Sequence, residues 1–161
     1  MVTEHAVPSS GGLVELAWLI PVLPLVSFLL ISFFGRRLPL RGASLGILAV
    51  GIPWLMSVAL FFQFLTESTH AIERSVRWFD LGSFEVELGM SVDGVAAMMF
   101  VVVTTVSLLV HIYSVSYMEH EPRFTWYFAA LSLFTGSMLN LVIANNLFQL
   151  LVGWELVGVC S

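Results

Sequence analysis

The sequence has 161 residues, of which 58% are hydrophobic and only 11% are charged, and its formal net charge at pH 7 is -5. Soluble domains average about 45–50% apolar and about 25% charged residues, so this composition excludes an ordinary soluble domain and a disordered segment. Six arginines without any lysine, set against eleven acids, exclude a nucleic-acid-binding surface. The single cysteine, Cys160, excludes an internal disulfide and a cysteine-based zinc site.

The charged residues gather in short clusters between long uncharged runs, which is typical of a chain that crosses a bilayer. A spanning helix needs about 20 apolar residues to cross about 30 Å of hydrocarbon. The last uncharged run is too long for one crossing, and its paired amides, Asn145 and Asn146, favour a turn. The sequence therefore predicts five helices, over residues 16–35, 43–66, 93–118, 124–144 and 146–161.

These ranges predict an all-α polytopic membrane protein, in which a tail of residues 1–15 precedes a transmembrane bundle over residues 16–161. The fifth helix has 16 residues, which is too few to complete a crossing. We therefore expect a fragment of a longer fold. A tilted or re-entrant last helix is the alternative.

The basic residues predict the orientation of the bundle. Arg36, Arg37 and Arg41 lie between the first two helices, whereas residues 1–15 contain acids and no arginine. Under the positive-inside rule, the first loop is therefore cytoplasmic and the N-terminus lies outside. The same lack of basic residues near the start excludes a secretory signal peptide.

The exterior loop, residues 67–92, is long enough to form structure of its own. From Phe84 to Val92, apolar side chains alternate with polar residues and glycine, which is the period of a half-buried strand. Residues 81–83 can turn the chain, so a short β-hairpin is predicted. We expect this hairpin to cap the helix ends. An acidic funnel that collects ions is the alternative.

Small residues recur at helical spacing within the spans. Gly42 and Gly46 form a GxxxG pair, and Ser132 and Gly136 repeat that spacing in a later helix. Such pairs allow helices to approach each other closely. Asn140, in the same later helix, is expected to form a hydrogen bond to a neighbouring helix.

One acid, Glu155, falls well inside a predicted span, about 15 Å along the fifth helix. A carboxylate at that depth costs roughly 2.5–3.5 kcal/mol, so it needs a proton, a basic partner or water. The spans contain neither lysine nor arginine, so a cationic partner has to come from outside this sequence. An intramembrane acid favours an ion or proton path, and a structural acid bonded to a neighbouring helix is the alternative.

Two further residues are candidates for the same path. His111 lies toward the cytoplasmic end of the third helix, where an imidazole can relay protons or simply complete the packing. Asp93 opens that helix at its outer end, where we expect it to cap the N-terminus, with a minor role in a proton path as the alternative. Nucleotide-binding, metal-binding and haem-attachment motifs do not occur in the sequence.

Three segments of the sequence match motifs of one membrane protein family. Residues 153–161 read GWELVGVCS, residues 111–118 read HIYSVSYM, and residues 91–93 read SVD. They resemble the GWExxGxxS segment, the HxYSxxYM segment and the start of the third helix in the antiporter-like L subunit family of respiratory complex I. The resemblance covers about residues 16–161, and it extends to the large subunit of Mrp sodium/proton antiporters.

The resemblance implies a longer fold of fourteen core helices, with two inverted five-helix repeats that contain broken helices. It implies that Glu155 is the family's essential glutamate, which pairs with a lysine on a later helix, and that His111 lies near a polar axis. That lysine falls outside this sequence. The resemblance also implies that this chain holds no redox site, cofactor or metal, since NADH, FMN, iron–sulfur clusters and quinone belong to other subunits.

The function implied is proton translocation by a non-redox membrane subunit of NADH–quinone oxidoreductase, coupled to electron transfer elsewhere in the complex. The expected partners are the lipid bilayer and other membrane subunits, especially the neighbouring antiporter-like M subunit, in the bacterial inner membrane. Two alternatives stay open. One is an Mrp-type sodium/proton antiporter subunit, and the other is a purely structural subunit in which Glu155 only fixes packing.

Overall fold

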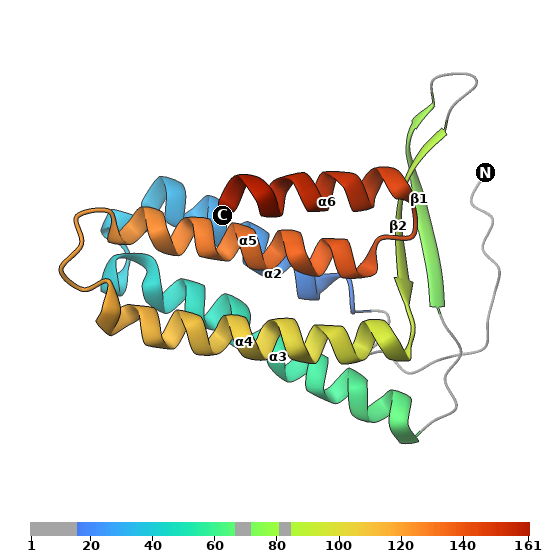
Figure 1. The fold of residues 1–161 in the computed structure, drawn as a ribbon, viewed down its shortest axis with the longest axis horizontal. Helices are drawn as coiled ribbons and strands as arrows, with labels where there is room; N and C mark the ends of the chain where they lie inside the picture. The colour runs from blue at the N-terminus through green and yellow to red at the C-terminus, as the bar shows by residue number, and fades with distance from the viewer. Residues whose placement is uncertain (1–15, 67–71, 81–84) are drawn as a thin grey trace.

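The computed structural model describes residues 16–66, 72–80 and 85–161. Helices lie side by side, and a two-stranded hairpin crosses one end of the bundle (Figure 1). The helices are α2 (Leu19–Phe34), α3 (Ala43–Thr66), α4 (Gly94–Tyr117), α5 (Phe124–Ile143) and α6 (Leu147–Cys160). The strands are β1 (Ile72–Asp80) and β2 (Glu85–Val92), and two 3-10 helices, η1 (Gly35–Arg37) and η2 (Pro39–Gly42), join α2 to α3. The predicted tail and the predicted hairpin turn lie outside the described residues.

This architecture confirms the predicted fold class, a helical membrane bundle with a β-hairpin. By length and composition, α3, α4 and α5 can each cross a membrane. Helix α2 is shorter than the span expected for it, because residues 16–18 form turns and regular helix begins at Leu19. Its 16 residues rise about 24 Å. Helix α6 is also short, with 14 residues.

Side-chain caps fix where two of the helices begin. Asp93 Oδ1 accepts a hydrogen bond from the Ala96 N–H at 2.7 Å, so Asp93 is the N-cap of α4, as predicted. Asn146 Oδ1 accepts one from the Gln149 N–H at 2.8 Å and caps α6 in the same way. The chain therefore breaks between α5 and α6 at the predicted amide pair.

Small residues lie where helices touch, as their spacing predicted. A Cβ on Gly42 would lie 3.0 Å from Ile31 of α2, and the φ angle of Gly42 is +96°, a conformation that favours glycine. A Cβ on Gly136 of α5 would lie 2.6 Å from Leu25 of α2. Larger side chains at either position would push α2 away from its neighbours.

Two apolar clusters fill the interior of the bundle. One lies toward the hairpin and includes Phe100, Val92 and Leu139. The other lies toward η1 and η2 and includes Phe128 and Ile31. All five side chains are fully buried. The stretch of α4 between the two clusters carries the buried polar side chains that form the candidate site.

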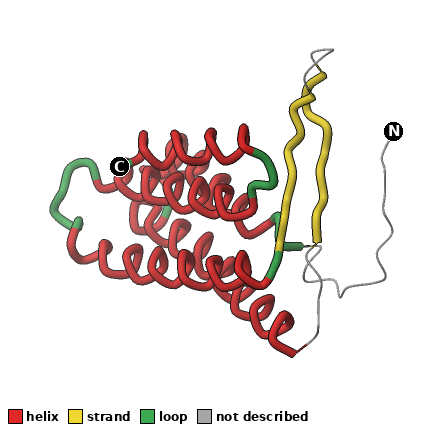
Figure 2. The backbone as a smooth tube through the Cα atoms, turned by 45° about the vertical axis from the view of Figure 1, so that its right-hand side comes forward, coloured by secondary structure: helices red, strands yellow, loops and turns green. Residues whose placement is uncertain are grey.

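The hairpin caps the bundle where α4 begins and α5 ends, as predicted (Figure 2). β1 and β2 pair antiparallel, with Ser75 opposite Gly89. The Gly89 N–H donates to Gln149 Oε1 at 2.9 Å, and Gln149 Nε2 donates to Asn140 Oδ1 at 3.1 Å. One buried glutamine therefore ties β2, α5 and α6 together, and Asn140 forms the interhelical hydrogen bond expected of it.

Gly89 leaves no room for a side chain, because a Cβ there would overlap the amide of Asn145. We predict that Gly89→Ala shifts β2 off the α5–α6 turn and lowers the free energy of unfolding by roughly 1–3 kcal/mol. Gly94→Ala is the matched control, because a Cβ on Gly94 would meet no atom of the described residues within 4 Å. Thermal unfolding in detergent measures both variants. Equal melting temperatures for Gly89→Ala and the parent would contradict this docking.

Candidate functional site

Polar side chains form one buried stripe along α4. Its members follow each other at intervals of three and four residues, which places them on one face of the helix. They are Thr104, Ser107, His111 and Ser114, each at most 9% exposed. Because α4 packs against α3 and α5, the stripe lies inside the bundle.

His111 is fully buried within this stripe. Its Nδ1 lies 2.8 Å from the carbonyl oxygen of Ser107, and because a carbonyl can only accept, the Nδ1–H donates. In a neutral imidazole the other nitrogen, Nε2, then carries the lone pair. The ring also contacts Phe128 of α5, with ring centroids 6.0 Å apart.

A hydrogen-bond chain leads from His111 to α5. Ser107 Oγ lies 3.3 Å from His111 Nδ1 and 2.5 Å from Thr135 Oγ1. Thr135 Oγ1 itself donates to the carbonyl of Leu131 at 2.9 Å. Because the Thr135 hydroxyl has a single proton, Ser107 is the donor between the two hydroxyls. The chain therefore runs from the imidazole through two hydroxyls into the backbone of α5.

Two more polar contacts hold the helices around His111. Ser114 Oγ lies 2.9 Å from the hydroxyl of Tyr127, which links α4 to α5 one turn further along. Trp54 Nε1 donates to Thr105 Oγ1 at 2.9 Å, which links α3 to α4. The position of His111 is thus set by hydrogen bonds on both sides of α4.

Sequence reasoning found His111 but missed its hydroxyl partners. A signal for Ser107 was present, because hydroxyl residues repeat at helical spacing with His111 in an otherwise apolar segment. Thr135 carried no such signal. Its role depends on which face of α5 packs against α4, and this becomes visible only in the folded chain.

Glu155 lies on α6, eight residues after Leu147, a rise of about 12 Å. Its side chain is exposed, and the exposed surface of α6 is otherwise apolar, with Trp154 and Val159 among its residues. The inner face of α6 packs on α5 through Gly153, where a Cβ would lie 3.2 Å from Leu141. The acid therefore lies on an apolar face that the described residues leave uncovered.

The structure does not bring the three predicted site residues together. His111 is enclosed by α3, α4 and α5, whereas α6 packs on α5 and β2 and exposes Glu155. Asp93 is exposed at the start of α4, 18 residues before His111, and about 27 Å from it along the helix axis. Its capping bond to the Ala96 N–H accounts for its position.

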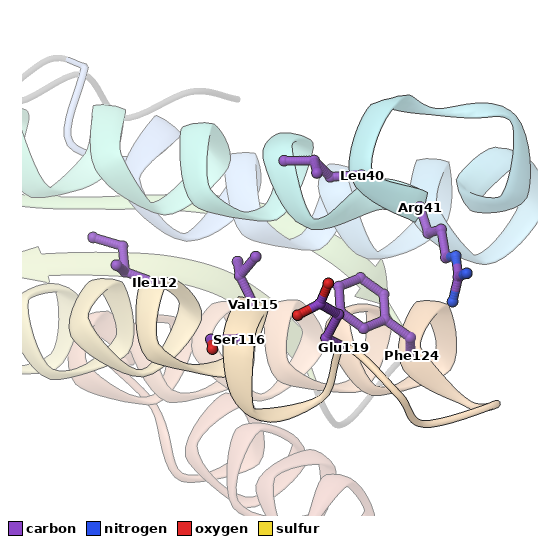
Figure 3. Close-up of a pocket in the computed structure, with 7 residues that line it drawn as sticks. All are labelled: Leu40, Arg41, Ile112, Val115, Ser116, Glu119 and Phe124. Atoms are coloured by element: carbon purple, nitrogen blue, oxygen red, sulfur yellow. The ribbon is translucent and has the colours of Figure 1, made fainter.

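A separate pocket of about 490 Å³ opens between η2 and the end of α4 (Figure 3). Arg41 and Glu119 bring one charge of each sign to its lining. The other lining residues are Leu40, Ile112, Val115, Ser116 and Phe124. The predicted site residues do not line this pocket. Within the described parts of the chain, no three His, Cys, Asp or Glu side chains gather in a way that could hold a metal ion.

We predict that Thr135→Val lowers the free energy of unfolding by roughly 1–3 kcal/mol, because it leaves the buried Ser107 hydroxyl without its acceptor. Valine has nearly the shape of threonine, so the effect reports the hydrogen bond. Thr66→Val is the matched control, since Thr66 is exposed and, within the described part of the chain, its hydroxyl bonds to backbone of its own helix. Thermal unfolding in detergent compares the variants. Equal destabilisation by both variants would show that the hydrogen bond between α4 and α5 contributes nothing to the free energy of unfolding.

Known proteins resemble this chain in sequence and in fold. A family model described as NADH-Ubiquinone oxidoreductase (complex I), chain 5 N-terminus, matches residues 78–128. F(420)H(2) dehydrogenase subunit L of Methanosarcina mazei is 44% identical over 150 residues, which are 93% of this chain and 22% of the relative. NAD(P)H-quinone oxidoreductase chain 5 of Synechocystis sp. is 45% identical over 157 residues, which are 92% of this chain and 23% of the relative.

The fold is similar to one chain of the membrane-bound sulfane sulfur reductase, an archaeal respiratory membrane complex. The TM-score is 0.70 at 17% sequence identity, over 91% of this chain and 29% of that chain. The present chain spans less than a quarter of the length of the two sequence relatives. These matches confirm the resemblance seen in the sequence motifs: the chain is similar to the N-terminal portion of the antiporter-like subunit L (chain 5) of complex I.

Proposed function

We propose that this chain is part of a proton-translocating membrane subunit of NADH–quinone oxidoreductase, which couples electron transfer in other subunits to proton movement. The observation that carries the proposal is the buried polar stripe around His111, inside helices that are otherwise apolar and long enough to span a membrane. Polar and ionisable side chains are expensive in that environment, and they commonly mark ion and proton paths.

The names of the relatives support a role that is shared by enzymes with different electron donors. One relative is named as a subunit of an F(420)H(2) dehydrogenase and the other as a chain of an NAD(P)H-quinone oxidoreductase. Both nevertheless align with more than nine tenths of this chain. We therefore assign NADH oxidation, FMN, iron–sulfur clusters and quinone to other subunits, and proton movement to this one.

Glu155 is proposed to couple charge to this movement. A carboxylate on the apolar face of α6 needs a proton, a cation or water. A basic side chain that covers this face would hold the carboxylate ionised. If that side chain moved away, the carboxylate would take up a proton, so small displacements would change its charge.

The same proposal puts the chain in a bacterial inner membrane, beside other membrane subunits that include the antiporter-like M subunit. Exposed apolar side chains on α2, α4 and α6 suit lipid or such neighbours. The arginines of η1 and η2 support a cytoplasmic position for that end of the bundle, which leaves the N-terminus and the hairpin outside.

The decisive variant for this function is Glu155→Gln in the intact complex, reconstituted in vesicles. Glutamine keeps the size and most hydrogen bonds of the side chain but cannot titrate. We expect an assembled complex whose proton pumping falls by about tenfold or more. Glu155→Asp keeps the charge on a shorter side chain, so its proton pumping should lie between that of the parent and that of Glu155→Gln. Pumping and NADH–quinone activity are measured together, with assembly checked on native gels.

Glu119→Gln is the matched control, because Glu119 is exposed in the turn after α4, and this variant should pump like the parent. An assembled Glu155→Gln complex with parental pumping would contradict the proposal. It would favour the purely structural role instead.

Cysteine labelling checks the orientation. In a Cys160→Ser background, Glu73→Cys reports the hairpin, and His120→Cys reports the turn after α4. The hairpin and this turn lie at opposite ends of the bundle (Figure 1). Both positions are exposed. We expect a membrane-impermeant maleimide, added to the outer face of the membrane, to label position 73 and not position 120. Labelling of position 120 alone would show that the bundle has the opposite orientation to the one proposed. Labelling of both from one side would contradict a membrane-spanning bundle.

A further inference from the structure

Two buried polar atoms face the same glycine. His111 Nε2 on α4 and Ser132 Oγ on α5 are enclosed, and neither has a hydrogen-bond partner among the described residues. A Cβ on Gly46 of α3 would lie 3.4 Å from Nε2 and 3.5 Å from Oγ. Less than about 7 Å therefore separates the two polar atoms, and glycine leaves the space between them free of a side chain.

The two atoms are complementary in hydrogen bonding. The Nδ1–H of His111 donates to the Ser107 carbonyl, so Nε2 offers a lone pair. Ser132 offers a hydroxyl proton and can also accept. A water molecule that accepts from Ser132 and donates to Nε2 satisfies both groups, and such a bridge of two hydrogen bonds spans about 5–6 Å.

We infer that Gly46, His111 and Ser132 form a binding site for one ordered water molecule. With this water, the hydrogen-bond chain runs from Thr135 through Ser107 and His111 to a second hydroxyl of α5. Gly46 is a positioning residue, because its missing side chain provides the volume that the water occupies.

The part that this site plays in proton movement rests on the proposed function. A proton that reaches the water passes to the Nε2 lone pair, so the imidazole becomes an imidazolium and the water is left neutral. His111 is thereby connected to its surroundings through both ring nitrogens, one by direct hydrogen bonds and the other through water.

The glycines of α3 differ in what they touch, and this difference supplies a matched control. A Cβ on Gly46 would also lie 3.2 Å from His111 Cδ2, which is a tight contact, so a methyl group there intrudes on the space beside Nε2 that the water needs. A Cβ on Gly51, in the same helix, would meet only Leu108 Cδ1 at 3.9 Å, an ordinary contact. Alanine at position 51 therefore changes α3 to the same extent without entering the site.

A second pair of variants removes a hydroxyl without adding any atoms to the bundle. Ser132→Ala takes away one of the two groups that hold the water, and a buried water needs at least two polar partners. Ser137→Ala is its control on the same helix, because the Ser137 hydroxyl donates to the Leu133 carbonyl of α5 at 2.7 Å.

Solid-state NMR of the full-length protein in lipid vesicles tests the water site. Magnetisation is transferred from water protons to ¹⁵N-labelled histidine side chains, and the His111 signal is assigned by its disappearance in His111→Gln. We expect magnetisation transfer from water to Nε2 in the parent, in Gly51→Ala and in Ser137→Ala. We expect no such transfer in Gly46→Ala and Ser132→Ala.

Three results would overturn the inference. The first is that the parent protein shows no magnetisation transfer from water to Nε2. The second is that Ser132 donates a hydrogen bond directly to Nε2. The third is that the transfer from water to Nε2 persists in Ser132→Ala. Because Ser132→Ala only removes an atom, a failure of Gly46→Ala to fold leaves the test intact.

Proton pumping by the same variants in the intact complex separates this inference from the proposed function. We expect several-fold lower pumping for Gly46→Ala and Ser132→Ala and parental pumping for both controls. If all four variants pump like the parent while Gly46→Ala and Ser132→Ala abolish the NMR transfer, the role in proton movement is overturned and the water site is upheld. Parental pumping in Glu155→Gln would show that the proposed function itself has failed.

Discussion

The constraint on which this structure depends is that hydrocarbon offers polar side chains no hydrogen-bond partners. Several hydroxyls of the spanning helices find a hydrogen-bond partner within their own helix, by donating to a backbone carbonyl one turn earlier. Ser57, Thr104 and Ser137 do so to Pro53, Phe100 and Leu133, respectively. His111 cannot satisfy both ring nitrogens in this way, so it depends on neighbouring helices.

That dependence links polarity to helix packing. Ser107 reaches Thr135 across the α4–α5 contact, and Gly46 lets α3 approach the imidazole from the other side. The apolar clusters on either side, around Phe100 and Phe128, separate this polar region from both ends of the bundle. An ionisable group is thus held at a defined position within an apolar interior, as a proton path requires.

Helix α6 differs from α4, because its ionisable side chain is exposed and not enclosed by neighbouring helices. Its acid, Glu155, lies on an exposed apolar face, away from the polar region of α4 and α5. The sequence placed His111 and Glu155 on one path, whereas α5 lies between them in the fold. A neighbouring helix or subunit that covers α6 would have to supply the partner for Glu155. On the proposed route, the two residues would therefore act at separate positions.

Local patterns carried most of what could be predicted from the sequence. The alternation before Val92 predicted β2, and the residue types of Asp93 and Asn146 predicted helix boundaries, because strand period and capping depend on neighbours in sequence. The start of α2 was misplaced, since hydropathy does not mark where the turns over residues 16–18 give way to helix.

Contacts between distant segments could not be predicted. Ser132 and Gly46 each had an assigned role in close packing, but their convergence on His111 depends on the rotation of three helices about their axes. Gln149, which ties the hairpin to α5 and α6, carried no signal in the sequence for the same reason.

The central claim is that a carboxyl group of this chain changes its protonation during turnover. Infrared difference spectroscopy of the intact complex during NADH oxidation measures this directly. The account predicts a carboxylic-acid C=O band that changes during turnover and is missing from the difference spectrum of Glu155→Gln. Identical carboxylic-acid bands in the parent and in Glu155→Gln would contradict it.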